Sequence, residues 1–247
     1  METQRYSIEL AYNGNDFYGW QIQPRQISVQ ETIEKALSKL FDAKKINIVG
    51  CGRTDTGVHA KHYIAHVDLP SKWEEEILTH KLNRILPDSI VIYTIQKVNE
   101  DFHARFHAKA RTYRYFIHSQ KDPFINNTSL YYTKTLDMDK MNKAGLLLHG
   151  KKDFTSFSKL HTDVFTNICT VSKAKWTKVN EHAFYFEITA DRFLRNMVRA
   201  IVGTLLEVGE GKITPDEITS ILDKNDRCEA KMSVPAHGLF LWEITYR

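Results

Sequence analysis

The order of predicted secondary structure constrains the fold of this chain more than any other feature of its sequence. Hydrophobic spacing makes the first half a strand, a helix, two strands, a helix and a strand, which is the β-α-β-β-α-β order of a ferredoxin-like unit. The segments that carry this pattern are residues 5–12, 28–41, 46–50, 62–69, 73–86 and 89–98. Ser28 is predicted to cap the first helix, and the acidic first turn of the second helix suits the helix dipole. The first half is therefore predicted to form one ferredoxin-like unit.

The second half shows the same order of elements, with one additional helix. Its strands are predicted over 111–119, 168–179, 183–190 and 239–246, and its helices over 138–149, 193–209 and 214–224. Thr214 and Pro215 occupy the cap and first-turn positions of the additional helix. We predict an α+β fold of two ferredoxin-like halves, residues 1–105 and 106–247, joined into one extended, mainly antiparallel sheet with helices on one face and a central cleft.

Composition excludes several classes of protein. With 247 residues, 42% hydrophobic and 26% charged, the chain is long enough to bury a substantial core. Its three cysteines, Cys51, Cys169 and Cys228, lie far apart, which argues against a disulfide framework or a zinc knuckle. No apolar run approaches the roughly 18 residues of a membrane span, and the N-terminus does not resemble a signal peptide, so a cytoplasmic location is expected. The net charge of +4 permits a polyanionic partner.

One loop stands out, the segment GCGRTDTGVHA from Gly50 to Ala60. It places Arg53 two residues before Asp55 among small, turn-forming residues. An ordinary turn does not need an arginine and an aspartate at this spacing. A guanidinium beside a carboxylate lowers the pKa of the acid and keeps it ionised. The loop therefore raises the question of what a carboxylate held beside a guanidinium does on a tight turn.

A metal site is not predicted. His59, His62 and His66 recur at short steps, but they lie in a predicted strand without the glutamate of an HExxH motif or a cysteine partner. The segment GEGKIT lacks the GxxxxGKS/T spacing of a phosphate loop, and no GxSxG motif is present. The histidines are therefore expected to be structural, and GEGKIT is expected to be a turn.

Aromatic and basic residues are concentrated in the segment FHARFHAKARTYRYFI, residues 102–117. Arginine and lysine neutralise phosphates, and aromatic faces stack on unpaired bases at about 1–3 kcal/mol per stack, so this mixture suits single-stranded or distorted RNA. In a strand, however, Tyr113 and Tyr115 would share one face while Arg114 and Phe116 share the other. A core strand with a solvated basic edge is therefore the alternative interpretation.

The predicted helix over 193–209 adds a second basic feature. Arg192, Arg195 and Arg199 fall at i, i+3 and i+7, which is one stripe of a helix, and apolar residues gather on the opposite side. Such a face is usually solvated surface, but three arginines without an acidic partner along the stripe favour a nearby anion. That anion is either RNA phosphate or the carboxylate of Asp55.

Six segments together resemble the tRNA pseudouridine synthase A family. They are YNGNDFYGWQIQP, SVQETIEKAL, GCGRTDTGVHA, FHARFHAKARTYRYFI, FLRNMVRAIVG and VPAHGLFLWEITY, in the family's order and over nearly the whole chain. The sequence departs from the family at Asn13, where aspartate is common, and at Asn167, where an arginine often precedes the strand. The second departure puts in question any RNA contact made there, and neither departure touches the loop with Asp55.

The resemblance implies the isomerisation of uridine to pseudouridine in the anticodon stem-loop of tRNA, without a metal or an organic cofactor. It also implies a pseudouridine synthase fold with a central RNA-binding cleft, and a homodimer in which each tRNA contacts both subunits. The loop suits this chemistry, because the N-glycosidic bond must break without hydrolysis, whereas hydrolytic glycosidases typically use a pair of carboxylates. Whether Asp55 attacks the sugar or removes one of its protons is left open.

The resemblance further implies roles for individual residues. Asp55 matches the catalytic aspartate, and Arg53 matches the arginine that enters the RNA stem while the target nucleotide is flipped out. The alternative role of Arg53 is local, to lower the pKa of Asp55. Tyr113 matches the tyrosine that stacks on the target uracil and takes part in removing the proton from C5, so the resemblance makes it a catalytic as well as a substrate-binding residue. Arg199 matches the basic residue that pairs with the catalytic aspartate. Weaker candidates for phosphate contacts are Arg105, Arg111, Arg192, Arg195, Lys151 and Lys152.

Two other classes of protein are considered. A non-catalytic RNA-binding protein of ferredoxin-like fold can also use exposed aromatics, but it has no use for the Arg53–Asp55 loop, and the RNP1 pattern of such modules is missing. A hydrolytic ribonuclease would be expected to carry a histidine pair or a carboxylate cluster that holds a metal. Isomerisation is therefore the leading hypothesis.

Overall fold

The computed structural model describes the whole chain except residues 1–2, 72, 160–164 and 247. The described residues form five helices and ten strands, and the strands are mainly antiparallel, which confirms the predicted α+β class. The chain divides into two compact units: unit 1 comprises Met1–Lys109 and Leu241–Arg247, and unit 2 comprises Ala110–Phe240. The C-terminal strand, which the sequence analysis places in the second half, thus belongs largely to unit 1. The joining of the halves into one sheet around a cleft stays a prediction.

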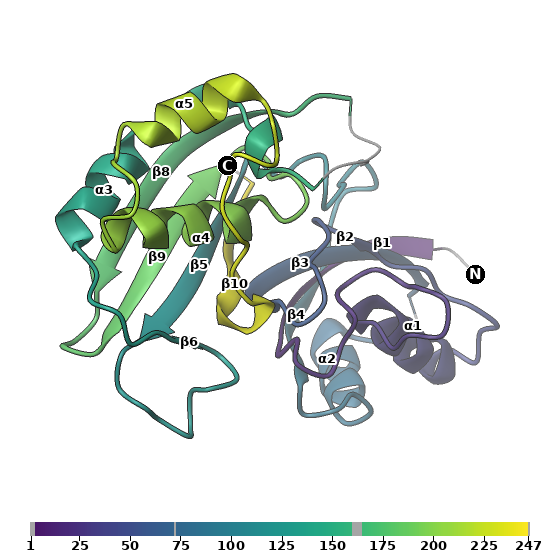
Figure 1. The fold of residues 1–247 in the computed structure, drawn as a ribbon. Coiled ribbons are helices and arrows are strands. Elements are labelled where there is room, and N and C mark those ends of the chain that lie inside the picture. Colours follow the sequence, from purple (N-terminus) through teal and green to yellow (C-terminus); the bar gives the residue numbers. More distant parts are fainter. Residues whose placement is uncertain (1–2, 72, 160–164, 247) are drawn as a thin grey trace. The chain divides into compact units, whose positions relative to one another are not determined.

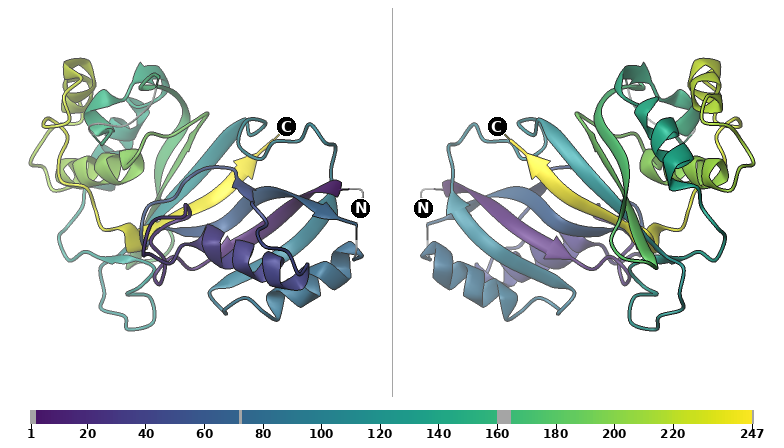
Figure 2. Two further views of the ribbon diagram at one scale, coloured as in Figure 1. Left: turned by 90° about the vertical axis from the view of Figure 1, so that its right-hand side faces the viewer. Right: turned by 90° about the vertical axis from the view of Figure 1, so that its left-hand side faces the viewer.

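Unit 1 has the ferredoxin-like order of elements that the sequence predicts (Figure 1). It consists of β1 (Thr3–Tyr12), α1 (Val29–Leu40), β2 (Val49–Gly50), β3 (His59–Pro70), α2 (Glu75–Asn83), β4 (Ile90–Lys97) and most of β10 (Leu239–Thr245). β1 lies between β3 and β4 and is antiparallel to both, while β2 and β10 pair with β3. Figure 2 shows α1 and α2 on one face of this sheet.

The core of unit 1 fixes the strand ends at which the candidate site begins. Ser28 caps α1 as predicted, because its hydroxyl accepts a hydrogen bond from the backbone N–H of Glu31 at 3.2 Å. Buried side chains that β1 and α1 contribute to the core are Tyr6, Ile8, Leu10, Val29, Ile33 and Leu37. Burying each such side chain is worth about 1.5–3 kcal/mol, so a slip of register would be costly. This register sets Tyr12 opposite Ala60, at the start of β3.

Unit 2 contains a four-stranded antiparallel sheet, with an additional short strand on its edge and three helices (Figure 1). Its elements are β5 (Ala110–His118), β6 (Leu130–Tyr131), α3 (Met138–Leu146), β7 (Gly150–Asp153), β8 (Ile168–Lys178), β9 (Ala183–Ala190), α4 (Met197–Gly209) and α5 (Glu217–Lys224), with 3₁₀ turns η1 (Thr155–Phe157) and η2 (Ala236–Gly238). The strand order is β5-β9-β8-β7, and β6 is parallel to β5. The short strands β6 and β7 are not among the predicted elements.

The predicted helix over 193–209 is wrong at its beginning. α4 starts only at Met197, because Asn196 has a left-handed backbone (φ 66°), which a continuous right-handed helix excludes. The side chain of Asn196 donates instead to the hydroxyl of Ser233 at 2.7 Å. Arg192 and Arg195 therefore precede the helix, and the three arginines do not form the helical stripe that the sequence analysis expects.

Other differences concern the ends of elements. The predicted strand over 46–50 forms only its last two residues, Val49–Gly50, and the predicted helix over 73–86 is limited to Glu75–Asn83. The N-cap of α5 is Asp216 rather than Thr214, whose backbone N–H and hydroxyl instead bind the carboxylate of Glu217. These differences leave the order of the predicted elements unchanged.

The three histidines of β3 serve the architecture of unit 1, as predicted. The Nδ1 atoms of His59, His62 and His66 accept backbone N–H groups from Gly14 (3.0 Å), Ile244 (3.2 Å) and Ala104 (3.1 Å), respectively. Each histidine thus ties another segment of unit 1 to β3. Among the described residues, no group of three or more His, Cys, Asp or Glu is arranged to hold a metal ion. No helix of the described chain is both long and apolar enough to cross a membrane.

Candidate active site

The loop between β2 and β3 carries Arg53 and Asp55. The side chain of Arg53 is exposed and that of Asp55 is partly exposed. A hydrogen bond from the backbone N–H of Val58 to the carbonyl of Asp55, at 3.1 Å, closes a turn in this loop. Gly57, inside this turn, has a left-handed backbone (φ 75°), which glycine adopts without strain. The loop therefore presents a guanidinium and a carboxylate close together in the chain on a defined turn.

Two buried tyrosine hydroxyls bind the residues on either side of the arginine, one through a side chain and one through the backbone. The hydroxyl of Tyr12 is hydrogen-bonded to Oγ1 of Thr54 at 2.8 Å, and the hydroxyl of Tyr63 donates to the carbonyl of Gly52 at 2.5 Å. Both tyrosines are almost completely buried, and the ring of Trp20 stacks on Tyr63 with 4.0 Å between the ring centroids. The loop is thus anchored to a rigid aromatic cluster of unit 1.

The segment YNGNDFYGW packs its backbone against the same loop. A Cβ atom on Gly14 would lie 2.1 Å from the carbonyl oxygen of Val58, and one on Gly19 would lie 2.4 Å from that of Thr54. Gly19 also has a left-handed backbone (φ 84°), and the N–H of Trp20 donates to the carbonyl of Thr54 at 3.3 Å. No side chain fits at either glycine, so this segment forms a cradle for the loop.

The two departures from the family pattern have local structural roles. The side-chain oxygen of Asn13 accepts the backbone N–H of Asn15 at 3.1 Å, a bond that an aspartate would also accept. The side-chain amide of Asn167 donates to Oγ1 of Thr155 at 2.8 Å in unit 2. Neither asparagine belongs to the Arg53–Asp55 loop.

In unit 2, Arg111 and Tyr113 lie on β5. Tyr113 is partly exposed, and its ring meets Phe193 edge-on with 5.0 Å between centroids. Arg111 donates from Nη1 to the carbonyl of Asp191 at 2.8 Å. Both side chains are thus positioned by the segment that follows β9.

Arg114 on the same strand has a structural partner. Its guanidinium and the amine of Lys173 both bind the carboxylate of Glu187. Burial alone would raise the pKa of Glu187, but the hydrogen bonds from Lys173 and Arg114 outweigh it and hold the pKa below its ordinary value. This part of β5 therefore fits the interpretation as a core strand rather than a phosphate-binding surface.

Arg199 lies in the first turn of α4 and is partly buried. Its Nε donates to the carbonyl of Val234 at 2.7 Å, while the hydroxyl of Tyr115 donates to the neighbouring carbonyl of Pro235 at 2.9 Å. Arg195 is exposed, and its carbonyl accepts the N–H of Lys159 at 3.0 Å. Of the predicted arginines of this segment, only Arg199 is therefore in the helix.

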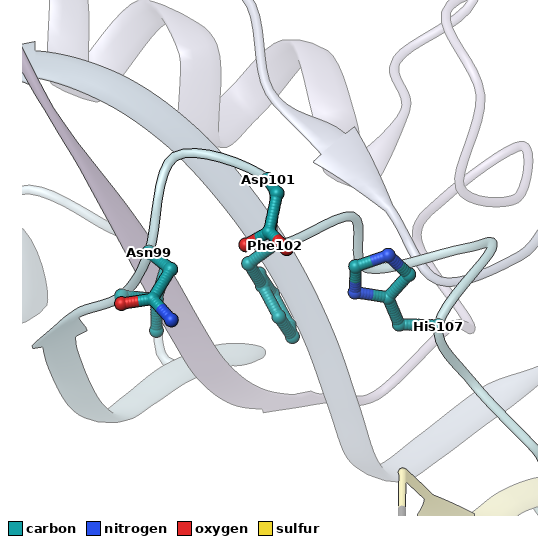
Figure 3. Close-up of a pocket in the computed structure, with 5 residues that line it drawn as sticks. Asn99, Asp101, Phe102 and His107 are labelled. Atoms are coloured by element: carbon teal, nitrogen blue, oxygen red, sulfur yellow. The ribbon is translucent and has the colours of Figure 1, made fainter.

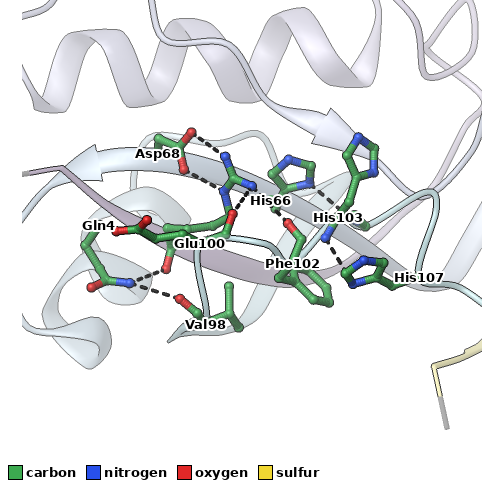
Figure 4. Close-up of polar contacts among 10 residues, drawn as sticks. Gln4, His66, Asp68, Val98, Glu100, Phe102, His103 and His107 are labelled. Atoms are coloured by element: carbon green, nitrogen blue, oxygen red, sulfur yellow. Dashed lines mark hydrogen bonds and ion pairs between the residues drawn. The ribbon is translucent and has the colours of Figure 1, made fainter.

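Arg105 belongs to a turn of unit 1 that follows β4. Figure 4 shows the polar contacts around this turn. The guanidinium of Arg5 holds the start of this turn through the carbonyls of Glu100 and Phe102, and it binds both carboxylate oxygens of Asp68 at 2.7 and 2.8 Å. The hydrogen bond from Arg5 lowers the pKa of Asp68. Figure 3 shows the open pocket beside the turn, which is lined by Val98, Asn99, Asp101, Phe102 and His107.

The stability of unit 1 is expected to fall as the pH drops from about 6.5 to about 4. Burial, followed by the positive charge of Arg5, lowers the pKa of His66 to about 4. Below an ordinary pKa of about 6.5 the unfolded chain binds a proton that the folded chain does not, so folding loses up to about 3 kcal/mol across this window. Urea denaturation at a series of pH values measures the effect. His66→Gln, which keeps an acceptor for Ala104 but cannot titrate, should flatten the curve, and an unchanged curve would contradict this role.

The predicted site residues thus fall into separate groups within each unit. Unit 1 holds Arg53 and Asp55 on one loop and Arg105 on another turn. Unit 2 holds two pairs, Arg111 with Tyr113 on β5, and Arg195 with Arg199 at the start of α4. Lys151 and Lys152 lie on β7, at the edge of its sheet. The loop of unit 1 places a carboxylate and a guanidinium two residues apart in the chain.

Comparisons with known proteins find the same family over almost the entire chain. A family model described as tRNA pseudouridine synthase matches residues 10–107 and 144–247. A tRNA pseudouridine synthase A of Bacteroides fragilis is 50% identical over 247 residues, covering 100% of this chain and 98% of the relative. The relative of the same name from Parabacteroides distasonis is 51% identical, over 98% of this chain and 96% of its own length. The one from Bacillus subtilis is 39% identical, over 98% of this chain and 99% of its own length. The family-model match includes the loop of Asp55 and helix α4, whereas Arg111 and Tyr113 lie between its two matched ranges.

Proposed function

Because the chain belongs to the tRNA pseudouridine synthase family, whose members are isomerases, we propose that it converts uridine to pseudouridine in the anticodon stem-loop of tRNA with Asp55 as the catalytic group. The observation that carries this proposal is the anchoring of the Arg53–Asp55 loop. Two tyrosine hydroxyls and two glycine backbones fix this loop, and its charged side chains remain accessible. A preorganised carboxylate of this kind is what a reaction at a sugar carbon requires.

The chemistry requires one carboxylate and the exclusion of water. The N-glycosidic bond of the target uridine breaks, the uracil turns while it stays bound, and its C5 joins the same sugar carbon. The proton on C5 is then lost and N1 gains a proton, so that the net reaction is an isomerisation. Asp55 acts on the sugar, either as the nucleophile or as the base that removes a sugar proton, and both roles need the ionised acid. A hydrolase would instead need a second carboxyl group to handle water or the leaving group.

Arg53 is proposed to enter the RNA stem when the target nucleotide leaves it. Flipping a nucleotide out of a stem costs a few kcal/mol of pairing and stacking, which a side chain that fills the gap can offset. The exposed side chain of Arg53, on a backbone anchored at Gly52 and Thr54, supports this role. Tyr113 is proposed to stack on the target uracil, and Arg105, Arg111 and Arg195 are proposed to contact the RNA.

Removing the hydroxyl of Tyr63 should slow the reaction more than it weakens binding. Tyr63→Phe keeps the stacked ring but loses the hydrogen bond to Gly52, which costs about 1–2 kcal/mol of stability and loosens the loop. We expect the single-turnover rate at saturating tRNA to fall about 10-fold, with little change in Kd. Tyr93→Phe, at an exposed tyrosine of β4, is the matched control. Equal rates for the two variants would contradict the anchoring role.

Arg199 is proposed as the partner of the Asp55 carboxylate in the catalytic state. Arg199→Ala should then lower kcat strongly and also reduce stability, by less than the roughly 3–5 kcal/mol that breaking a fully buried pair costs, because both Asp55 and Arg199 are only partly buried. Adding Asp55→Asn to this variant should restore part of the stability, because the uncompensated charge is removed. Thermal denaturation of the two single variants and the double variant measures the coupling. Strict additivity would mean that Arg199 acts only through its bond to Val234.

The proposed partners are tRNA and a second copy of the chain. Sedimentation of the protein in dilute solution is expected to show a homodimer, and a fully active monomer would contradict it. The site of modification is tested by incubating an unmodified tRNA transcript with the protein and mapping pseudouridine by reverse transcription after carbodiimide treatment. New stops within the anticodon stem-loop are expected, and stops confined to other stems would overturn this assignment.

A further inference from the structure

The turn from Phe102 to His107 is held by polar contacts from several sides (Figure 4). Its tip is nevertheless exposed. The N–H of Ala104 donates to His66, and the carbonyl of Ala104 accepts the hydroxyl of Tyr246 at 2.7 Å. Together with the bonds from Arg5 to the preceding carbonyls, these contacts leave Ala104 completely buried at the centre of the turn. Loop tips are ordinarily the least constrained parts of a structure. This one is held in a single orientation.

Phe106 is the side chain that this orientation presents. It is 72% exposed, and its ring lies 4.2 Å from the imidazole of His103 at 34°. Nδ1 of His103 accepts the backbone N–H groups of Arg105 and Phe106 at 3.2 and 3.3 Å, which locks the tip. Burial, and then the charge of His107, lowers the pKa of His103, so the ring beneath Phe106 is a neutral aromatic at physiological pH.

The surroundings of Phe106 select the kind of ligand. The guanidinium carbon of Arg105 lies 5.7 Å from the centre of the phenyl ring, and Lys109 is exposed in the same segment. An apolar protein partner would gain nothing from these cations, whereas a nucleotide offers a flat base for the ring and a phosphate for a cation. The charge and the exposed ring together therefore favour RNA.

We propose that Phe106 is a stacking platform for an unpaired base of the tRNA, with Arg105 beside the adjoining phosphate. This inference rests on the proposed function in taking tRNA as the ligand. The base is not the target uridine, because the turn is attached to β3 at His66 and the catalytic loop joins β3 at His59. Seven residues of strand at about 3.3 Å each separate these two points by roughly 23 Å. The platform thus sets the register of the tRNA at a distance from the chemistry.

The test compares substitutions that remove or keep an aromatic face. Phe106→Leu should raise the Kd for an unmodified tRNA transcript about 5- to 100-fold without changing the salt dependence of binding, since stacking is not ionic. Phe106→Trp should keep the affinity and add tryptophan fluorescence that is quenched when tRNA binds. Phe124→Leu, at another highly exposed phenylalanine, is the matched control and should bind like the unaltered chain. Because the ring of Phe106 is largely exposed, none of these variants should change the melting temperature.

Two results would overturn the proposal. One is an unchanged Kd for Phe106→Leu, and the other is a change of oligomeric state in sedimentation, which would mean that Phe106 contacts a second copy of the chain. Failure of the proposed function is distinguishable from either result. It would appear as an unaltered protein that binds tRNA, with an affinity sensitive to Phe106, and forms no pseudouridine.

Discussion

Asp55→Asn is expected to abolish pseudouridine formation while the affinity for tRNA stays within a few-fold of that of the unaltered chain. Asparagine has the size of aspartate, and the hydrogen bond that closes the turn is donated by the N–H of Val58 to the backbone carbonyl of residue 55, so the loop keeps its shape. What is lost is the negative charge that is proposed to act on the sugar. Removal of a central catalytic group lowers turnover by about 10⁴-fold or more. Single-turnover kinetics at saturating tRNA measure the loss.

The matched control for this variant is Asp16→Asn. Asp16 is an exposed carboxylate in the segment that cradles the loop, so its replacement makes the same change of charge nearby. It should leave the rate of turnover unchanged. Loss of tRNA binding by Asp55→Asn would indicate that the carboxylate is structural, and equal turnover of both variants would remove Asp55 from the chemistry.

Gly19→Ala is expected to lose turnover for a different reason, because it displaces the loop itself. The added methyl group would lie 2.4 Å from the carbonyl oxygen of Thr54, and the backbone of residue 19 has a φ of 84°, which L-residues rarely adopt. Overpacking and the left-handed conformation together cost about 2–4 kcal/mol of unfolding free energy. Because Thr54 directly precedes Asp55, relief of the clash moves the carboxylate, and we expect at least a 100-fold loss of kcat.

Gly52→Ala provides the comparison within the same loop. A Cβ atom on Gly52 would meet no other atom within 4 Å, and its φ is not in the left-handed region. Its free energy of unfolding should therefore stay within about 0.5 kcal/mol of the original. Denaturant titration of the two alanine variants measures the difference. Equal free energies of unfolding for the two variants would mean that the close approach of Gly19 to the loop does not contribute to stability.

The long elements could be predicted because their signals are local. The strands β1 and β3 alternate, and α1 combines helical spacing with the cap at Ser28. The start of α4 could not be predicted in this way, because Asn196 is turned by its contact with Ser233, which is distant in the sequence. Strands as short as β6 and β7 carry too few residues to show a period.

The candidate site was predictable to a similar extent. Arg53 and Asp55 stand out because their residue types are unusual for a turn. The roles of Tyr12 and Tyr63 depend on strand register and on hydroxyl contacts with the loop, which no spacing in the sequence reveals. Gly14 and Gly19 are visible in the sequence as glycines, but only the folded chain identifies the carbonyls that approach them.

The release of tritium from uridine shows whether Asp55 drives isomerisation without cleavage of the RNA. A tRNA transcript labelled with tritium at C5 of uridine is incubated with the protein and, separately, with Asp55→Asn. The unaltered chain is expected to release tritium to water while the tRNA stays full-length, and Asp55→Asn is expected to release none. Fully labelled, intact tRNA after incubation with the unaltered chain would exclude isomerisation, and shortened RNA would indicate a nuclease instead.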